Sequence, residues 1–485
     1  MKLKAIAAVC ALAFASQAHA LNPATTLAAG TNHVFVSGSS ALQVTIGQIA
    51  AAMFQPGTID VYFDASGNGA NYRAYSGTFK AGITGVTAGT NGVIYEQANG
   101  GSLMGIIPVA SANSVNAGLP ATAILNLNTC TNTGTVDSKS GGALWTCTGS
   151  TPAVADAGVA DVEPALFTGI NIPAGSPSVT PVMTNGLNIT SSLAQPMAII
   201  TTTNNTAVTS LTKAEVTALM DGLSTDWSYI SSAAPAAAPV TVCRRVAGSG
   251  TQATINDFFY GFPCSSSVQS PAAHQVVANF GAGGGNYTVI ENSSSGALAA
   301  CMTAVQKGTA PGYTINITNG TISTAAADAT HVTLPANGVA IGLMGLDRQP
   351  GAITNVGING ATGITETYKF VSIDGVVPSV ENATTGAYDI WVGNSWQSRN
   401  STVNGIAPMA AGSQQLAFYN ALVSTSGNPA ILGASKTPAV PGVAALSTYA
   451  YDPTTVASGA YAGTLLNPVM RVSKGNSCQP AQQVQ

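Results

Sequence analysis

The stretch over residues 242–260 reads VCRRVAGSGTQATINDFFY, and it decides how the rest of the chain is interpreted. The apolar residues at its start predict a strand, the Gly/Ser run a tight loop, and Ile255, Phe258 and Phe259 the buried face of a short helix. Such a loop leaves backbone N–H groups unpaired at the positive end of the helix dipole, and glycine lets a ligand approach the backbone closely. The stretch therefore predicts a site for an oxyanion.

Side chains at this loop add two kinds of donor. Ser249 and Thr251 carry hydroxyl groups, and Arg245 carries a planar, permanently charged fork that suits phosphate or carboxylate. The simpler alternative is that one hydroxyl only caps the helix and that Arg244 and Arg245 are ordinary surface charges. We favour the anion site because the chain has only six arginines and two of them are adjacent here.

Two similar patterns occur near the N-terminus. Residues 34–36 predict a strand, followed by a Ser/Gly loop over 37–40 and a helix over 41–54 whose apolar residues recur at helical spacing. Residues 59–63 alternate as a strand and run into a second small polar loop over 64–69. The three loops could converge on one ligand, or each could be the ordinary turn chemistry of an α/β fold.

Later segments continue the alternation of strands and helices. Thr212 and Glu215 form a capping-box pattern at the start of a helix. The remaining expected elements are strands over 196–200, 339–344 and 388–392 and helices leading from 296 and over 415–423. This alternation predicts an α/β architecture.

The first 20 residues predict a secretory signal peptide. Lys2 and Lys4 precede a short apolar segment that ends in Ala18-His19-Ala20, so we expect a mature protein from Leu21 that is periplasmic or secreted. That leaves 485 − 20 = 465 residues, with 15 − 2 = 13 basic against 19 acidic side chains. A balance of 13 − 19 = −6 lacks the basic footprint that nucleic acid needs, so we expect no nucleic-acid partner.

Six cysteines remain after the expected cleavage, and an even count in an exported chain favours disulfides over metal ligation. The pairs that we predict are Cys130 with Cys147, Cys243 with Cys264, and Cys301 with Cys478. The second pair would close a loop around the predicted anion site.

Four segments stand in an informative order along the chain. They are SGSS at 37–40, residues 211–227, RVAGSGT at 245–251, and residues 339–344 together with 371–392. This order resembles the phosphate-binding components of bacterial ABC phosphate importers, which belong to the type II periplasmic solute-binding proteins. The ordered set is more specific than any one of its segments, and the chain looks like a divergent member with large insertions.

The resemblance implies a two-lobed α/β fold that closes over an oxyanion, with Gly/Thr/Asn-rich insertions. It implies a first lobe over 21–110 and 345–485, a variable insertion over 111–194 and a second lobe over 195–344. The ligand-binding residues that it implies are Ser39, Ser40, Ser66 and Gly67 in the first lobe and Arg245, Ser249, Gly250 and Thr251 in the second. The expected partners are inorganic phosphate or a similar oxyanion and an ABC importer permease. We expect a monomer and no cofactor or metal.

The chain departs from the family pattern at two positions. Ala247 stands where the family has an aspartate, and a first-lobe aspartate that accepts the proton of hydrogen phosphate has no counterpart between Phe79 and Val136. Ser111 or Asn113 is the expected replacement.

Two other functional classes are considered. Low charge and long Thr/Asn/Gly-rich stretches would also suit an extracellular or cell-surface structural or adhesive protein that reuses the fold without transport. We expect no enzyme, because Ser249 lacks the nucleophile-elbow pattern and His33, His274 and His331 have no triad or metal spacing.

Overall fold

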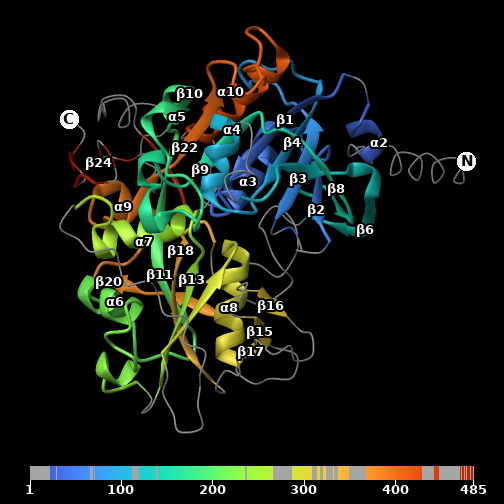
Figure 1. Ribbon diagram of the computed structural model, residues 1–485. Helices are drawn as coiled ribbons and strands as arrows, with labels where there is room; N and C mark the ends of the chain where they lie inside the picture. The colour runs from blue at the N-terminus through green and yellow to red at the C-terminus, as the bar shows by residue number, and fades with distance from the viewer. Residues whose placement is uncertain are drawn as a thin grey trace, which may run out of the picture.

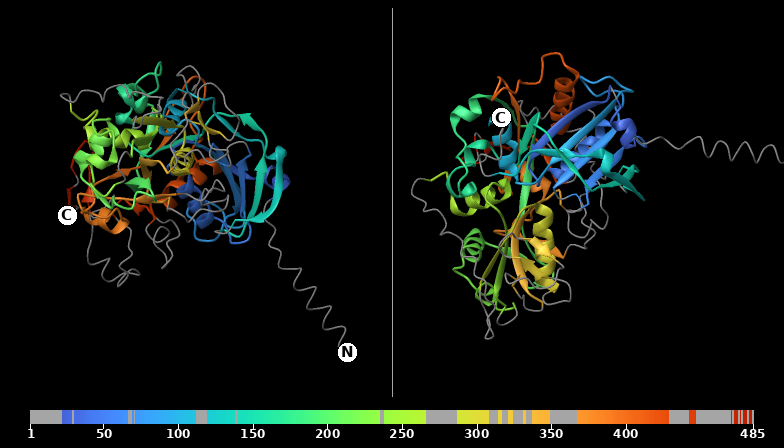
Figure 2. Two further views of the ribbon diagram at one scale, coloured as in Figure 1. Left: turned by 90° about the horizontal axis from the view of Figure 1, so that it is seen from below. Right: turned by 45° about the vertical axis from the view of Figure 1, so that its right-hand side comes forward.

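The chain, seen here in a computed structural model, is organised around two β-sheets that carry helices and define two lobes (Figure 1). Figure 2 shows the same division from two further directions. The residues that the structure describes are 22–28, 30–65, 69, 71–111, 119–137, 140–234, 238–265, 287–307, 314–316, 321–323, 331–332, 337–348, 367–428, 442–446, 470, 472–474, 476, 478–480 and 482–483. The expected signal peptide and His274 lie outside them.

The first lobe is built on a nine-stranded sheet. Its strands, in order across the sheet, are β10 (Leu187–Thr190), β22 (Ser395–Arg399), β9 (Ala157–Ala160), β1 (Asn32–Gly38), β4 (Asn91–Gln97), β3 (Tyr72–Thr78), β2 (Asp60–Asp64), β7 (Ala143–Cys147) and β6 (Cys130–Val136). Strand β1 is parallel to both of its neighbours, β4 and β9. The carboxyl ends of these three strands therefore meet at one edge, where α/β folds place their ligands.

The helices of this lobe are α3 (Gln43–Met53), α4 (Ile107–Ser111) and α10 (Gln414–Ser426), with the short η1 (Ser102–Gly105) after β4. Helices α3 and α10 pack with strands β1 and β2 around a core that includes Ile46, Phe54 and Phe418. Two of these helices are the ones predicted over 41–54 and 415–423.

The second lobe is built on a sheet with the central order β14 (Thr288–Asn292), β13 (Val240–Arg245), β18 (Val339–Gly345), β11 (Leu193–Thr202) and β19 (Tyr368–Phe370). β21 (Trp391–Gly393) and β23 (Ala444–Ala445) also pair with β11. The main helices are α6 (Lys213–Met220), α7 (Gly250–Tyr260), α8 (Ser295–Lys307) and α9 (Val380–Thr385). Strand β11 leaves the first lobe directly after β10, so it is one of the segments that connect the lobes.

Shorter elements complete the described chain. They are α2 (Pro23–Thr26), α5 (Pro181–Asn185), η3 (Leu127–Thr129), η4 (Pro164–Leu166), η5 (Gly169–Asn171), η6 (Trp227–Tyr229), β5 (Ala123–Leu125), β8 (Ser150–Pro152), β12 (Ser210–Leu211), β15 (Thr314–Asn316), β16 (Thr321–Ser323), β17 (His331–Val332), β20 (Ser372–Ile373), β24 (Val472–Ser473) and β25 (Gln482–Gln483).

Local sequence signals account for the starts of the second-lobe helices. The capping box predicted at α6 is present, because Glu215 N donates to Thr212 Oγ1 (3.1 Å) and Thr212 N donates to Glu215 Oε2 (2.7 Å). Helix α7 follows β13 after a short loop, and Ile255 and Phe259 on its inner face are buried, whereas Phe258 of the predicted buried face is only partly buried against the same core. The predicted strand, loop and helix over 240–260 are confirmed.

The three disulfides correct part of the predicted pairing. Cys130 bonds Cys147 as predicted, but the other two predicted pairs are wrong: Cys243 bonds Cys301 and Cys264 bonds Cys478. Cys243 lies within β13 and faces the core under α8, where Cys301 lies. Cys264 lies beyond the far end of α7, so it cannot reach the same face. No helix in the described part of the chain is long and apolar enough to span a membrane.

Candidate functional site

The start of α7 has free backbone donors. Ser249 occupies the N-cap position, and its carbonyl accepts the first helical hydrogen bond from Ala253 N (3.0 Å). The amides of Gly250, Thr251 and Gln252 have no acceptor among the described residues. These three N–H groups point out of the positive end of an eleven-residue helix, which favours an anion.

The Ser249 hydroxyl is buried and unpaired. The residue is 1% exposed, and its Oγ has no hydrogen-bond partner among the described residues. It caps none of the helix amides, so the simpler alternative that Ser249 serves only as a helix cap has no support. A buried hydroxyl without a partner costs about 1–3 kcal/mol, and a bound anion would remove that cost.

Arg245 is held in place by the loop that precedes α8. Its Nε donates to Asn292 O (3.0 Å), Nη1 to Ser295 Oγ (3.1 Å) and Nη2 to Ser293 O (2.9 Å). These bonds use three of the five guanidinium N–H groups and leave two for a ligand. Burial lowers the pKa of Arg245 to about 10, which the nearby Asp161 opposes and Arg348 reinforces. Arg245 therefore stays charged at neutral pH although it is 1% exposed.

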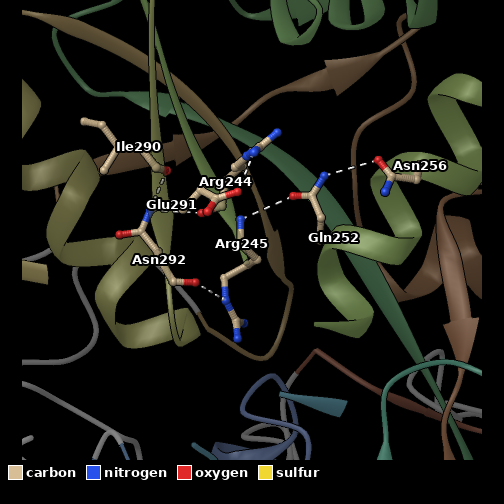
Figure 3. A network of polar contacts seen from close by, with 7 residues as sticks. All are labelled: Arg244, Arg245, Gln252, Asn256, Ile290, Glu291 and Asn292. Carbon is tan, nitrogen blue, oxygen red and sulfur yellow. Dashed lines mark hydrogen bonds and ion pairs between the residues drawn. The ribbon is translucent and has the colours of Figure 1, made fainter. Parts of the chain in front are cut away.

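The adjacent arginine has a different role. Arg244 points to the opposite side of β13 from Arg245, and its guanidinium pairs with Glu291 on β14 (Figure 3). The backbone N–H of Arg245 donates to Gln252 Oε1 (3.3 Å), and Gln252 Nε2 donates to Asn256 Oδ1 (3.2 Å). This chain of amides fixes the end of β13 against the first turn of α7.

Asp161 brings a carboxylate to the same helix terminus. It follows β9 directly, is 1% exposed, and accepts hydrogen bonds from Thr251 Oγ1 (3.2 Å) and Ser102 Oγ. A Cβ at Gly250 would lie 2.8 Å from Asp161 Oδ2 and 2.7 Å from Ser102 Oγ, so glycine is required there by close approach. The first lobe therefore touches the α7 terminus through a carboxylate and a hydroxyl.

The predicted first-lobe serines lie beside the start of α8. Ser39 Oγ accepts a hydrogen bond from the backbone N–H of Leu42 (3.0 Å), the residue just before α3. Ser40 Oγ accepts a hydrogen bond from Ser295 N (3.4 Å). The hydroxyl of Ser295 in turn accepts the hydrogen bond from Arg245 Nη1. Ser66 and Gly67 lie outside the described residues. Gly69, at the end of their loop, accepts from Gln43 Nε2 (2.9 Å), so that end of the loop lies against the first turn of α3.

The two lobes meet directly at this site. Leu103 N of the first lobe donates to Gly248 O (2.9 Å), and Gly248 N donates to Asn171 O (2.9 Å). A Cβ at Gly101 would lie 3.0 Å from Ser249 Cα. The loop before α7 is thus enclosed from the first-lobe side, and its donors face an interior with little access to water.

Two residues of this site were missed by the sequence reasoning, namely Asp161 and Ser102. Of the two predicted replacements for the family aspartate, Ser111 donates from Oγ to Ile107 O (2.7 Å) within α4, and Asn113 lies outside the described residues. Asp161 follows a short run of small apolar residues at the carboxyl end of a buried strand, and this strand signal is too weak to mark the residue in the sequence.

A metal site has little support in the described part of the chain. The group of potential ligands found there is Asp257, Cys264 and Cys478, and its two cysteines are joined in a disulfide. The donors at the α7 terminus are amides and hydroxyls, which suit an anion and not a cation.

Solved structures with a weak similarity to this chain include proteins that are named for phosphate. A structure of the ancestral soluble variant of the human phosphate binding protein has 13% sequence identity and a TM-score of 0.41, covering 91% of this chain and 99% of that chain. A phosphate binding protein from Stenotrophomonas maltophilia has 12% identity and a TM-score of 0.37, covering 85% and 96%. An ABC-type phosphate transport receptor from Vibrio cholerae has 12% identity and a TM-score of 0.29, covering 56% and 74%. These sequence identities and TM-scores are too low to carry an argument.

No curated protein matches the sequence. The model of the PBP superfamily domain matches residues 135–393, which is 393 − 135 + 1 = 259 of 485 residues and more than half of the chain. The match includes β13, the loop before α7 and the Asp161 position, and it agrees with the resemblance drawn from the order of motifs. The chain therefore belongs to the PBP superfamily, with the two-lobed α/β fold expected of it.

Proposed function

We propose that the protein is an exported oxyanion-binding protein whose ligand is inorganic phosphate. The observation that carries the proposal is the buried Ser249 hydroxyl beside three amides at the start of α7, none of which has a hydrogen-bond partner among the described residues. Every one of these groups is a donor, and a small tetrahedral anion offers acceptors in several directions at once.

The charges around the terminus support an anion that carries a proton. Arg245 supplies one buried positive charge, and Asp161 supplies an acceptor on the opposite lobe. Hydrogen phosphate can donate a proton to a carboxylate, whereas sulfate has none to give and would be repelled. Asp161 thus takes the part of the first-lobe aspartate that has no counterpart between Phe79 and Val136.

In this proposal both lobes contribute to one site. Ser249, Gly250 and Thr251 donate from the second lobe, Arg245 clamps the anion, and Ser39 and Ser40 line the site from the first lobe. Ser66 and Gly67, in the second first-lobe loop, are proposed to complete the ligand shell.

The direct test is calorimetric titration of the ligand-stripped mature protein with phosphate, with sulfate as the competitor. Arg245→Ala removes a charge-assisted interaction and should cost about 2–5 kcal/mol of affinity. Thermal unfolding of the variant must accompany the titration, since Arg245 also holds Asn292, Ser293 and Ser295. Unchanged affinity in a folded Arg245→Ala protein would contradict the site assignment.

A structural or adhesive role is the second candidate, and one observation favours it. Strand β6 is the last strand of the nine-stranded sheet, and the six residues from Thr131 to Val136 are exposed and uncharged. Open strand edges of this kind can pair with other chains. No heat and no thermal shift with phosphate or sulfate, combined with self-association that is lost when Thr131 and Thr135 are replaced by lysine, would favour this candidate over solute binding.

A further inference from the structure

A polar contact between the lobes lies at a short distance from the proposed anion site. Asp347, which follows β18 of the second lobe, accepts from Thr45 Oγ1 of α3 (3.1 Å) and from Gln195 Nε2 of β11 (2.9 Å). The same Gln195 nitrogen donates to Ala41 O (3.1 Å), just before α3. One carboxyl and one amide therefore tie the first turn of α3 to the second lobe.

This contact lies next to the two serines that the first lobe contributes to the proposed anion site. Ser39 and Ser40 immediately precede Ala41, and Ser40 already reaches the start of α8 through Ser295. If the first turn of α3 moves away from the second lobe, both serines move with it. Asp347 thus contacts the helical turn that directly follows the first-lobe donors.

We propose that Asp347 is a positioning residue whose carboxyl latches α3 to the second lobe, so that closure over the anion is coupled to the uptake of a proton. This inference rests on the proposed oxyanion-binding function. It assigns a role to a residue outside the ligand shell, and it adds a pH dependence that the anion site itself does not require.

Burial sets the direction of the coupling. Asp347 is 5% exposed, and desolvation raises its pKa to about 6, against the opposing effects of its hydrogen bonds from Gln195 and Thr45 and the charge of Arg348. In an open form with more water around it, the pKa falls back toward its ordinary value. The closed form therefore holds the proton more tightly, and closure is favoured as the pH falls through about 6 and weakened as the pH rises above it.

The surroundings of Asp347 contain one charged group among the described residues. Arg348 is next to it in the chain, α3 presents Ala41 and Thr45, and the packed segment at 442–446 carries no charge. A proton on Asp347 Oδ2 can be donated to Thr45 Oγ1, because a hydroxyl oxygen also accepts hydrogen bonds. Gln195 Nε2 continues to donate to Asp347 Oδ1 and to Ala41 O, so protonation keeps the contact between the lobes and leaves no new donor unpaired.

The test compares wild type with Asp347→Asn by calorimetric titration with phosphate between pH 5 and pH 7. The ratio of the two affinities removes the titration of phosphate, which both experiments share. A pKa of about 6 in the closed form and an ordinary value in the open form predict that wild type gains about tenfold in affinity over Asp347→Asn as the pH falls from 7 to 5. A constant ratio overturns the latch.

Asp60→Asn is the matched control. Asp60 is also fully buried, and desolvation raises its pKa to about 7. It lies on β2, and the described residues that act on it, Trp145, Ala143 and Tyr62, belong to the same first-lobe sheet. Its replacement should leave the pH profile of phosphate affinity as in wild type. If Asp60→Asn flattens the profile as Asp347→Asn does, the effect is one of general stability and the latch is wrong.

Failure of the proposed phosphate binding can be told apart from failure of the role given to Asp347. If wild type binds no phosphate at any pH, solute binding fails, and X-ray scattering of the ligand-free proteins then decides the latch. The latch predicts a larger radius of gyration at pH 7 than at pH 5 for wild type and a pH-independent radius for Asp347→Asn. Equal radii in wild type at both pH values overturn it.

Discussion

Replacing Ser249 with alanine should change stability and affinity in opposite directions. In the ligand-free protein Ser249 Oγ is buried with no partner among the described residues, so its removal deletes a desolvated hydroxyl and no hydrogen bond. Such a group costs about 1–3 kcal/mol, and we expect the variant to be as stable as wild type or more stable by about 1 kcal/mol. Urea unfolding of the phosphate-free proteins measures this difference.

The same variant should bind phosphate less tightly. A hydrogen bond to a charged group contributes about 1.5–3 kcal/mol, which corresponds to a loss of about 10- to 150-fold in affinity. Calorimetric titration of both proteins at one pH gives this number. The combination of unchanged or higher stability with weaker binding is what distinguishes a ligand-binding hydroxyl from a structural one.

Ser413→Ala is the control for this prediction. Ser413 caps α10 in the first lobe, and its hydroxyl accepts from Leu416 N (3.2 Å). Loss of that cap should cost about 1 kcal/mol of stability and leave phosphate affinity unchanged. If Ser249→Ala behaves as Ser413→Ala does, with lower stability and unaltered binding, the hydroxyl is structural and the reasoning about α7 is refuted.

Four further changes test other parts of the account. Gly250→Ala places a Cβ 2.8 Å from Asp161 Oδ2, so phosphate affinity should fall at least tenfold by calorimetry, and unchanged affinity would mean that the carboxylate is not held at the helix terminus. Asp161→Asn should relax the discrimination against sulfate, measured as the phosphate-to-sulfate affinity ratio; a ratio equal to that of wild type would contradict the role given to Asp161. Replacing Cys243 and Cys301 by alanine opens a loop of 58 residues and should cost about 4 kcal/mol in urea unfolding, with peptide mapping expected to show the Cys264–Cys478 bond intact. Because burial raises the pKa of Asp60 to about 7, its contribution to stability is present at low pH and is lost as the pH rises through about 7. In Asp60→Asn the unfolding free energy should therefore fall less between pH 5 and pH 8 than in wild type, by on the order of 1–4 kcal/mol. Parallel curves of unfolding free energy against pH would contradict this assignment.

The loop and helix at α7 could be predicted because their signals are local. An apolar strand, a Gly/Ser run and the helical spacing of Ile255 and Phe259 lie within 20 residues, so no long-range contact is needed to recognise them. The same holds for the capping box at Thr212. Arg245 was predicted for the site from its sequence position, and the structure holds its guanidinium against the start of α8.

Asp161 could not be predicted because its position depends on sheet order. Strand β9 carries the weak signal Ala-Gly-Val-Ala, since Gly158 packs so closely on Gly105 that a Cβ would lie 1.8 Å from the carbonyl oxygen of that residue. Such close contact between backbones allows only small residues. A strand made of small residues looks in the sequence like part of a variable, Gly/Ala-rich segment. Only the pairing of β9 with β1 brings Asp161 to the strand end that carries Ser39.

The disulfide pairing failed for a related reason. The spacing from Cys243 to Cys264 suggested a short loop, but Cys243 packs in the core with α8, whereas Cys264 packs against the other core cluster, which contains Phe259 of α7. Cys301 lies on α8, which covers β13 directly. Which cysteines that are distant in sequence can bond depends on which helix covers which face of the sheet. The periodicity of the sequence does not show this.

The central claim is that phosphate binds at the start of α7, and a crystal structure of the mature protein grown with phosphate tests it most directly. The account predicts density for one tetrahedral anion within hydrogen-bonding distance of Ser249 Oγ, of the amides of Gly250 and Thr251, and of the Arg245 guanidinium. An anion bound elsewhere would contradict the claim. So would a map at saturating phosphate in which these donors remain without a ligand.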